Sequence, residues 1–106
     1  RKRRMPSFEV RLTSDAEEDL LRLFNFLLEL DLELAIRSRQ AIEQSFSFLA
    51  HSPFTCRKAS AGALGPFVRE LLIPFGASGY LALFEIDDAQ HVTILAVRHQ
   101  REDDYH

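Results

Sequence analysis

The spacing of apolar residues changes once along the chain, and this change limits the folds that are open to it. Between residues 15 and 50 the apolar side chains recur at helical intervals, whereas from residue 67 onward they form short runs between turn residues. A period near 3.6 residues indicates helices, and short bounded runs are typical of strands. A length of 106 residues is that of one domain. We therefore expect one α+β domain.

The first half is predicted to be a strand followed by two helices. Residues 7–12 alternate between polar and apolar side chains, which indicates a half-buried strand. Ser14 and Glu17 have the spacing of a capping box, which predicts a first helix over residues 15–30. A break is expected at residues 31–33, and a second helix over 33–50 is ended by Pro53.

The first predicted helix has more apolar surface than a helix on one core requires. Its apolar residues cover more than half of its circumference, whereas a surface helix needs a stripe little wider than about 100°. They are Leu20, Leu21, Leu23, Phe24, Phe26, Leu27, Leu28 and Leu30. Either neighbouring elements bury both sides of this helix, or a partner chain covers part of it. In the second case Phe24, Leu27 and Leu28 are the expected partner contacts.

The second half is predicted to be an antiparallel meander. Gly and Pro residues mark a loop over 52–66, and turns over 76–79 and 87–90 separate strands at 67–75, 80–86 and 91–99. The predicted order is β-α-α-β-β-β. A helical hairpin would pack on a small antiparallel sheet that the first strand also joins.

Charge and composition limit the partners of this domain. The net charge is −3, and residues 1–4 contribute four positive charges, so the chain from Met5 onward has −7. We expect residues 1–6 to be a disordered or non-native extension, with a single domain over 7–106. Proteins that bind nucleic acid mainly through phosphates usually have the opposite sign, so the charge argues against nucleic acid as the main partner.

The cysteine and histidine content argues against several kinds of site. Cys56 is the only cysteine, which excludes an internal disulfide and fits a reducing, cytoplasmic location. The four histidines lack metal-ligand spacing, and no glycine-rich loop opens a helix, so no metal and no cofactor are expected. No segment approaches the roughly 18 apolar residues of a membrane span, so no membrane partner is expected.

Five short segments, in this order and spacing, resemble the ParE/RelE superfamily of type II toxin–antitoxin toxins. They are LTSDAEEDL at 12–20, LAHSP at 49–53, VREL at 68–71, SGY with FEI at 78–86, and VRH at 97–99. The resemblance implies a toxin encoded beside an antitoxin whose C-terminal segment wraps it. The complex would be a toxin–antitoxin hetero-oligomer, and a homo-oligomer is a further option.

The superfamily divides by target, and two features favour the ParE-like branch. RelE-like members cut messenger RNA, mostly in the ribosomal A site, whereas ParE-like members poison DNA gyrase. The long helical hairpin resembles the ParE-like side. Leu81 follows the tyrosine of the central strand, where RelE-like enzymes often have an arginine, and an aliphatic residue cannot neutralise a phosphate.

Candidate site residues depend on which branch is correct. A ribonuclease needs a base, an acid and a cation on the phosphate, and Arg69, Tyr105 and His106 are the candidates for these catalytic roles. A binding toxin would contact its target through basic residues, for which the candidates are Arg57, Lys58, Arg98, His99 and Arg101. The alternative interpretation is that these are the polar positions of a half-exposed strand and a solvated tail of mixed charge.

Three hypotheses follow. The favoured one is a non-enzymatic toxin that binds and inhibits DNA gyrase. The second is a ribosome-dependent mRNA endoribonuclease, and the third is a degenerate relative that retains only antitoxin binding.

Overall fold

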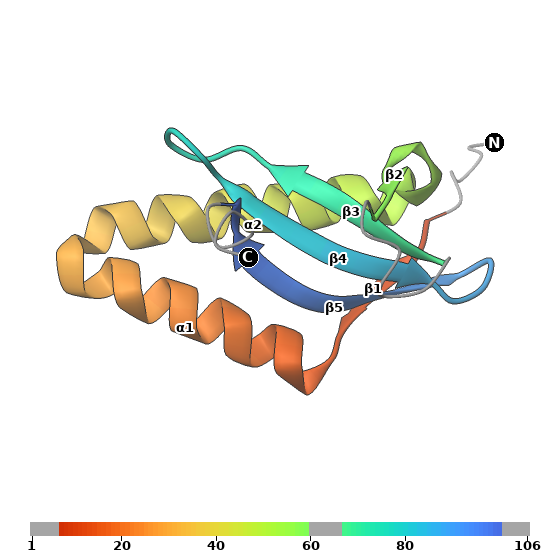
Figure 1. Cartoon of the computed structure of the whole chain (residues 1–106), viewed down its shortest axis with the longest axis horizontal. Coiled ribbons are helices and arrows are strands. Elements are labelled where there is room, and N and C mark those ends of the chain that lie inside the picture. Colours follow the sequence, from red (N-terminus) through yellow and green to blue (C-terminus); the bar gives the residue numbers. More distant parts are fainter. Residues whose placement is uncertain (1–6, 60–66, 101–106) are drawn as a thin grey trace, which may run out of the picture.

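The computed structural model describes residues 7–59 and 67–100, in which two helices pack on a five-stranded sheet (Figure 1). The elements are β1 (Glu9–Leu12), α1 (Ser14–Leu30), α2 (Leu32–His51), a 3-10 turn η1 (Pro53–Thr55), β2 (Arg57–Lys58), β3 (Val68–Ile73), β4 (Tyr80–Ile86) and β5 (His91–His99). The predicted α+β class and element order are confirmed. The turn η1 and the two-residue strand β2 are additions within the predicted loop.

The sheet has the order β1-β5-β4-β3-β2 and is mixed. Strands β3, β4 and β5 form the predicted antiparallel meander, and β2 pairs antiparallel with β3. Strand β1 joins the sheet as expected but runs parallel to β5, with Glu9 opposite His91, so the sheet is not purely antiparallel. The pairing leads directly into α1, because the Thr13 N–H donates to the Ile94 carbonyl at 3.1 Å.

The helices begin and end at identifiable caps. The Thr13 side chain accepts a hydrogen bond from the Ala16 N–H at 3.0 Å, so the cap lies one residue before the predicted Ser14 and the Ser14–Glu17 capping box is wrong. Asp31 ends α1 and begins α2, since its N–H donates to Leu27 O and its carboxylate accepts from Glu33 N. The predicted break therefore shortens to one residue.

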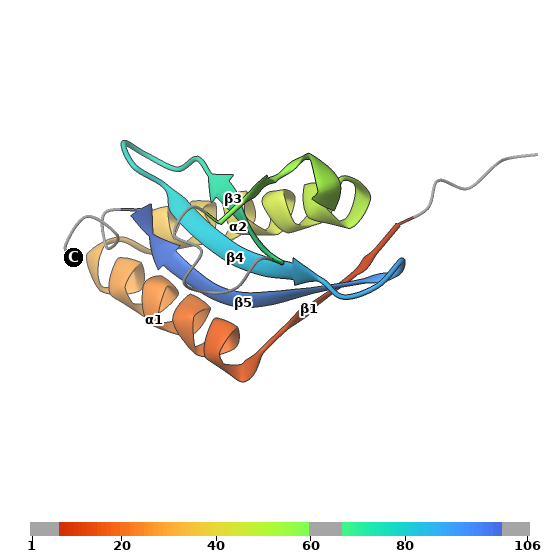
Figure 2. The same cartoon turned by 45° about the vertical axis from the view of Figure 1, so that its right-hand side comes forward.

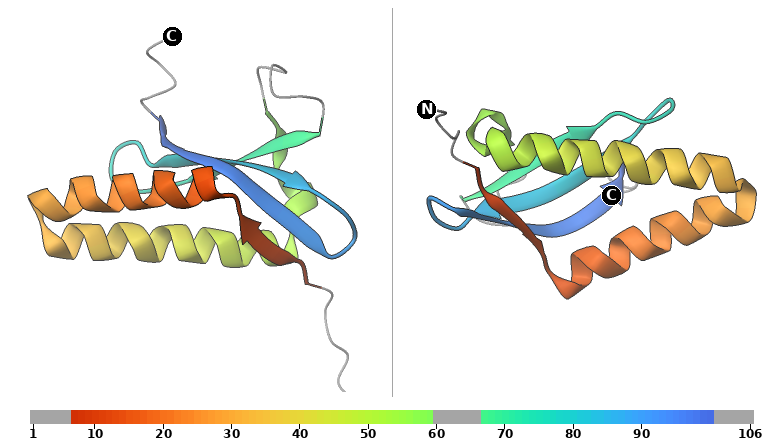
Figure 3. Two further views of the ribbon diagram at one scale, coloured as in Figure 1. Left: turned by 90° about the horizontal axis from the view of Figure 1, so that it is seen from below. Right: turned by 180° about the vertical axis from the view of Figure 1, so that it is seen from behind.

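Both helices bury their apolar sides against the same face of the sheet (Figures 2 and 3). The buried cluster combines helix residues Ala16, Leu23, Ile42 and Leu49 with strand residues Leu71, Ile73, Tyr80, Ala82, Phe84, Val92, Ile94 and Val97. The turn that joins the helices projects beyond the ends of the strands (Figures 1 and 3). The hairpin thus leaves part of its surface without contact to the sheet.

The opposite face of the sheet, here called the outer face, has a smaller apolar cluster. Val68, Leu81 and Leu83 are buried there, with Ala59, Leu95 and Ala96 packed against them. Because side chains alternate between the faces of a strand, neighbours such as Leu81 and Ala82 belong to different clusters. Strand β4 is therefore apolar on both faces, which explains its continuous apolar run.

Candidate functional site

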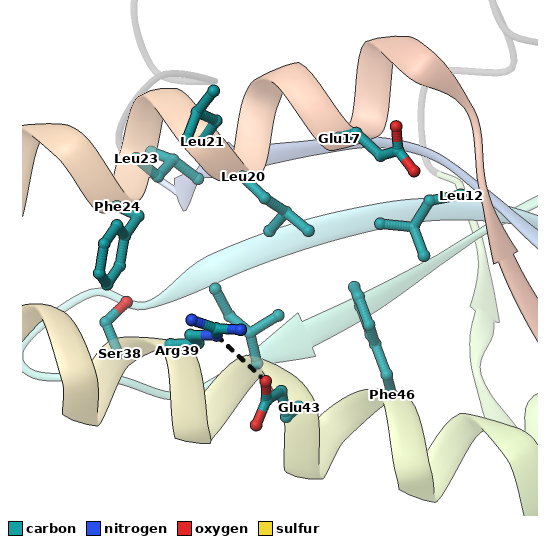
Figure 4. Close-up of a pocket in the computed structure, with 11 residues that line it drawn as sticks. Leu12, Glu17, Leu20, Leu21, Leu23, Phe24, Ser38, Arg39, Glu43 and Phe46 are labelled. Atoms are coloured by element: carbon teal, nitrogen blue, oxygen red, sulfur yellow. Dashed lines mark hydrogen bonds and ion pairs between the residues drawn. The ribbon is translucent and has the colours of Figure 1, made fainter.

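An apolar groove of about 420 Å³ lies between the two helices (Figure 4). Leu20 and Phe24 point from α1 toward α2, Phe46 points from α2 toward α1, and Leu12 of β1 lies at the α1 N-terminal end. The other lining residues are Glu17, Leu21, Leu23, Ser38, Arg39, Ile42 and Glu43. Such a groove suits the apolar side of a helix or an extended segment.

Three of the polar side chains that line the groove, Ser38, Arg39 and Glu43, are paired within the domain. Arg39 and Glu43, one helical turn apart, form an exposed ion pair at 3.2 Å. The buried Ser38 hydroxyl is hydrogen-bonded to the Tyr80 hydroxyl at 2.9 Å, which ties α2 to β4. A ligand in this groove would therefore gain mainly from apolar contact.

The three predicted partner contacts face different surroundings. Phe24 lines the groove, whereas Leu27 lines a separate apolar cavity of about 340 Å³ between the hairpin and the β3–β4 turn. Leu28 is exposed. The excess apolar surface of α1 is thus divided among the core, two hollows and solvent, and these three residues do not form one patch.

The end of the hairpin, residues 26–36 and here called the hairpin tip, exposes several large apolar side chains. The exposed fraction of Phe26 is 63%, and the other exposed members are Leu28, Leu30, Leu32 and Ile36. Its charged residues Glu29, Asp31 and Glu33 are all acidic. This surface suits a partner that is apolar and basic.

The predicted basic contacts around β2 lie on two faces of the sheet. Arg57 and Glu70 are opposite each other in the β2–β3 pairing and form an ion pair, in which the glutamate is buried. Lys58 and Arg69 form the next cross-strand pair, and both side chains are on the other face of the sheet. The Arg69 guanidinium donates to the Cys56 carbonyl at 2.6 Å and lies 5.8 Å from the Phe54 ring centre.

Arg69 and Arg98 do not meet in one site. Arg69 is opposite Phe84, which belongs to the core under the helices, whereas Arg98 is opposite Leu81 of the outer face. Because directly opposite residues share a face, the two arginines point to opposite sides of the sheet. His99 is on the helix side, where its ring meets Tyr80 edge-on at 5.7 Å. Arg101, Tyr105 and His106 lie outside the described residues.

Two exposed phenylalanines near Arg69 were not predicted. Phe54 of η1 and Phe67 before β3 line a hollow of about 450 Å³ together with Lys58 and Arg69. The exposed fractions of the two phenylalanines are 64% and 77%. The sequence does contain a signal for them: each phenylalanine directly follows a proline, Pro53 or Pro66, at one end of the predicted loop.

Two groups near this hollow have shifted pKa values. Burial raises the pKa of the Cys56 thiol, and the positive charge of Arg69 opposes that shift in part. The Gln90 backbone N–H and the His91 ring lower the pKa of Asp88. The Cys56 thiol therefore stays protonated at neutral pH, and Asp88 is ionised.

The described part of the chain has no group of metal-ligating side chains and no helix that could cross a membrane. Within residues 7–59 and 67–100, no three His, Cys, Asp or Glu side chains are grouped so that they could hold a metal ion. Neither described helix combines the length and the apolar character that crossing a membrane requires.

Comparison with known proteins gives a consistent result. A family model described as the ParE toxin of the type II toxin–antitoxin system parDE matches residues 10–104. Toxin RelE1 of Caulobacter vibrioides is 32% identical over 88 residues, which are 82% of this chain and 89% of that protein.

Two solved structures have a similar fold. A chain of the chromosomal ParDE system from P. aeruginosa has a TM-score of 0.70 at 19% identity, over 87% of this chain and 95% of that chain. A chain of the RelBE2 toxin–antitoxin complex from Mycobacterium tuberculosis has a TM-score of 0.56 at 27% identity, over 92% and 97%. With a family model that matches nearly the whole length and a relative above 30% identity, this chain belongs to the ParE toxin family of type II toxin–antitoxin systems.

Proposed function

We propose that this toxin arrests bacterial growth by binding and inhibiting DNA gyrase. The observation that carries the proposal is the position of Leu81, whose exposed fraction is 9% and which packs with Val68 and Leu83 on the outer face. RNA cleavage requires a cation against the scissile phosphate. The aliphatic side chain of Leu81 cannot stabilise that charge, so the centre of this face is suited to binding rather than to phosphate chemistry.

The distribution of the cations supports the same proposal. Arg57 and Arg98 are on the outer face, but Arg57 is paired with the buried Glu70, and Arg69 is on the opposite face of the sheet. A ribonuclease would need its cations to converge on one phosphate. The net charge of −3 also gives no general attraction for RNA.

The test uses purified toxin with purified gyrase and, separately, with translating ribosomes. We expect inhibition of supercoiling or accumulation of cleaved DNA complexes, and no cleavage of ribosome-bound mRNA. Replacing Arg98→Ala should weaken gyrase inhibition, whereas the matched change Arg11→Ala on β1 should not. Cleavage of mRNA with gyrase unaffected would establish the endoribonuclease alternative. No effect on either target would identify a relative that retains only antitoxin binding.

We further propose that the antitoxin places an apolar segment in the groove between α1 and α2. One of the similar structures is a toxin–antitoxin complex, and here the groove is lined by Phe24 and Phe46 without an unsatisfied buried side chain among the described residues. A charged side chain in the groove would be desolvated by the antitoxin, so Phe24→Glu should weaken binding strongly.

The control for the groove is the exposed Phe26 of the hairpin tip. Phe26→Glu places the same charge two residues farther along α1, outside the groove. Calorimetric titration with the antitoxin encoded beside the toxin should separate the two variants. Equal loss in both would place the antitoxin on the hairpin tip instead.

A further inference from the structure

We propose that the hollow formed by Phe54, Phe67, Lys58 and Arg69, here called the aromatic–cationic pocket, binds one nucleotide unit of a single nucleic acid strand. In this arrangement a base stacks on the exposed rings and the adjoining phosphate lies between the two cations. The site is separate from the helix groove and from the outer face, and it does not depend on gyrase being the toxin's target.

The two cations provide the first observation. Lys58 and Arg69 are directly opposite each other in the β2–β3 pairing, so their side chains emerge side by side on one face. Like charges in this position repel and destabilise the strand pair, and an anion between them would remove that cost. Arg69 is already held by the Cys56 carbonyl and the Phe54 ring, so less side-chain entropy is lost when it binds a phosphate.

The two aromatic rings provide the second observation. Phe54 and Phe67 are among the most exposed large apolar residues of the described chain, and both line this pocket. Phe54 is also in edge-on contact with Phe8, at 6.0 Å between ring centres. Exposed, fixed rings beside cations are the usual means of binding single strands, because every base has a face that can stack.

The acidic group at the pocket does not cancel this charge. Asp88 lines the pocket, but its carboxylate accepts from the Gln90 N–H at 2.8 Å and contacts the His91 ring at 2.8 Å. Glu70 lies on the other face with Arg57. Two cations and one carboxylate that is already hydrogen-bonded therefore line the pocket, which favours an anionic ligand over a basic or purely apolar one.

The test measures fluorescence anisotropy of a labelled oligothymidylate with the full-length toxin. One phosphate held between the two cations predicts that the logarithm of the binding constant falls with the logarithm of salt with a slope of about −0.7, and Lys58→Gln should weaken binding and make this slope shallower. Phe67→Ser removes a stacking surface and should weaken binding about 5- to 150-fold. The control Phe26→Ser removes another exposed ring, from the hairpin tip, and should leave binding unchanged.

Three comparisons decide the outcome. Oligouridylate of the same length distinguishes RNA from DNA, and binding of either strand that is lost in Phe67→Ser supports the proposal. Duplex DNA should bind more weakly, since its bases are already stacked. The proposal is overturned if neither strand binds at salt as low as about 50 mM. It is also overturned if Phe26→Ser weakens binding as much as Phe67→Ser, or if the duplex binds as tightly as the single strand.

Discussion

At the scale of single residues, the turn between β3 and β4 contains two glycines with different surroundings. Both have positive φ, 62° for Gly76 and 91° for Gly79. A Cβ at Gly79 would lie 2.2 Å from the Ile73 carbonyl oxygen, whereas a Cβ at Gly76 would meet nothing within 4 Å. Gly79 is therefore required both by its backbone angles and by its close approach to β3.

Replacing each glycine by alanine should separate these two effects. Gly76→Ala incurs only the penalty of left-handed backbone, about 1 kcal/mol of unfolding free energy. Gly79→Ala adds the displacement of β3 backbone, so we expect a loss of about 3 kcal/mol or more. Urea unfolding of both variants provides the measurement. Equal losses in the two variants would show that the turn relaxes without strain.

The only cysteine gives a prediction about pH. The thiolate is the reactive form, and burial raises the pKa of the Cys56 thiol above its ordinary value despite the nearby Arg69. At pH 7 to 8 less of this thiol is ionised than in a free cysteine, so alkylation by iodoacetamide should be slower than for N-acetylcysteine. The difference should shrink as the pH rises above the ordinary thiol pKa. A faster rate at neutral pH would mean that Arg69 dominates over burial.

At the scale of elements, α1 and β5 are joined at an irregularity in the sheet. The pairing of β4 with β5 shifts register between Leu83 and Phe84, and the backbone near Leu95 departs from the regular ladder. Two side chains from the start of α1 form hydrogen bonds with the β5 backbone at this point. The Thr13 hydroxyl donates to Leu95 O at 3.2 Å, and the Asp19 carboxylate accepts from the Val97 N–H at 2.9 Å. The start of α1 thus completes the hydrogen bonding of β5.

Removing this link should destabilise the domain. Asp19→Ala leaves the partly buried Val97 N–H without its acceptor, which typically costs about 1–3 kcal/mol. The exposed Glu18, one residue earlier on the same helix, is the matched control, and Glu18→Ala should cost less than about 1 kcal/mol. Chemical denaturation of the two variants measures the difference. A similar small loss in both would mean that solvent replaces the Asp19 carboxylate at the irregularity.

The sequence predicted the elements better than their pairing. Apolar periodicity and the break at Asp31 located both helices and the three meander strands to within a few residues, because those signals are local. The parallel direction of β1 and the irregularity near Leu95 depend on contacts far along the chain, which periodicity does not encode. Strand β2 is two residues long, too short for a pattern to form.

The candidate site was predicted in part for the same reason. Arg57, Lys58 and Arg69 lie near one another because β2 pairs with β3. However, side chains alternate between the faces of a strand, so Arg57 is on a different face from the other two. Composition alone could not show that Phe54 and Phe67 line one pocket, since that depends on how the 3-10 turn and β3 meet. Only Phe24 of the predicted partner contacts lines the groove between the helices.

At the scale of the whole molecule, charge and apolar surface are distributed unequally. The hairpin tip combines exposed Phe26 and Leu30 with acidic residues, and the chain has no basic residue between Arg22 and Arg37. The two cations of the aromatic–cationic pocket lie on β2 and β3, at the opposite end of the molecule from the hairpin tip (Figure 1). The domain therefore presents two surfaces of opposite charge, each with exposed apolar side chains, which are suited to different partners.

The hairpin tip should also make the isolated toxin associate with itself. Two tips that meet would bury apolar surface but bring Glu29, Asp31 and Glu33 of each copy together, so repulsion should keep association weak at low salt. The screening length is about 10 Å at 0.1 M salt and falls to about 3 Å at 1 M, so association should strengthen with salt.

Sedimentation equilibrium over this salt range, without antitoxin, tests the prediction. The double variant Phe26→Gln, Leu30→Gln should remain monomeric at high salt, because it removes apolar side chains and leaves every charge in place. Phe67→Gln, a matched loss from the aromatic–cationic pocket, should associate like the unchanged chain. A toxin that stays monomeric at every salt concentration would show that the tip is too small to hold two copies together. Association lost only in Phe67→Gln would instead assign the contact to the pocket.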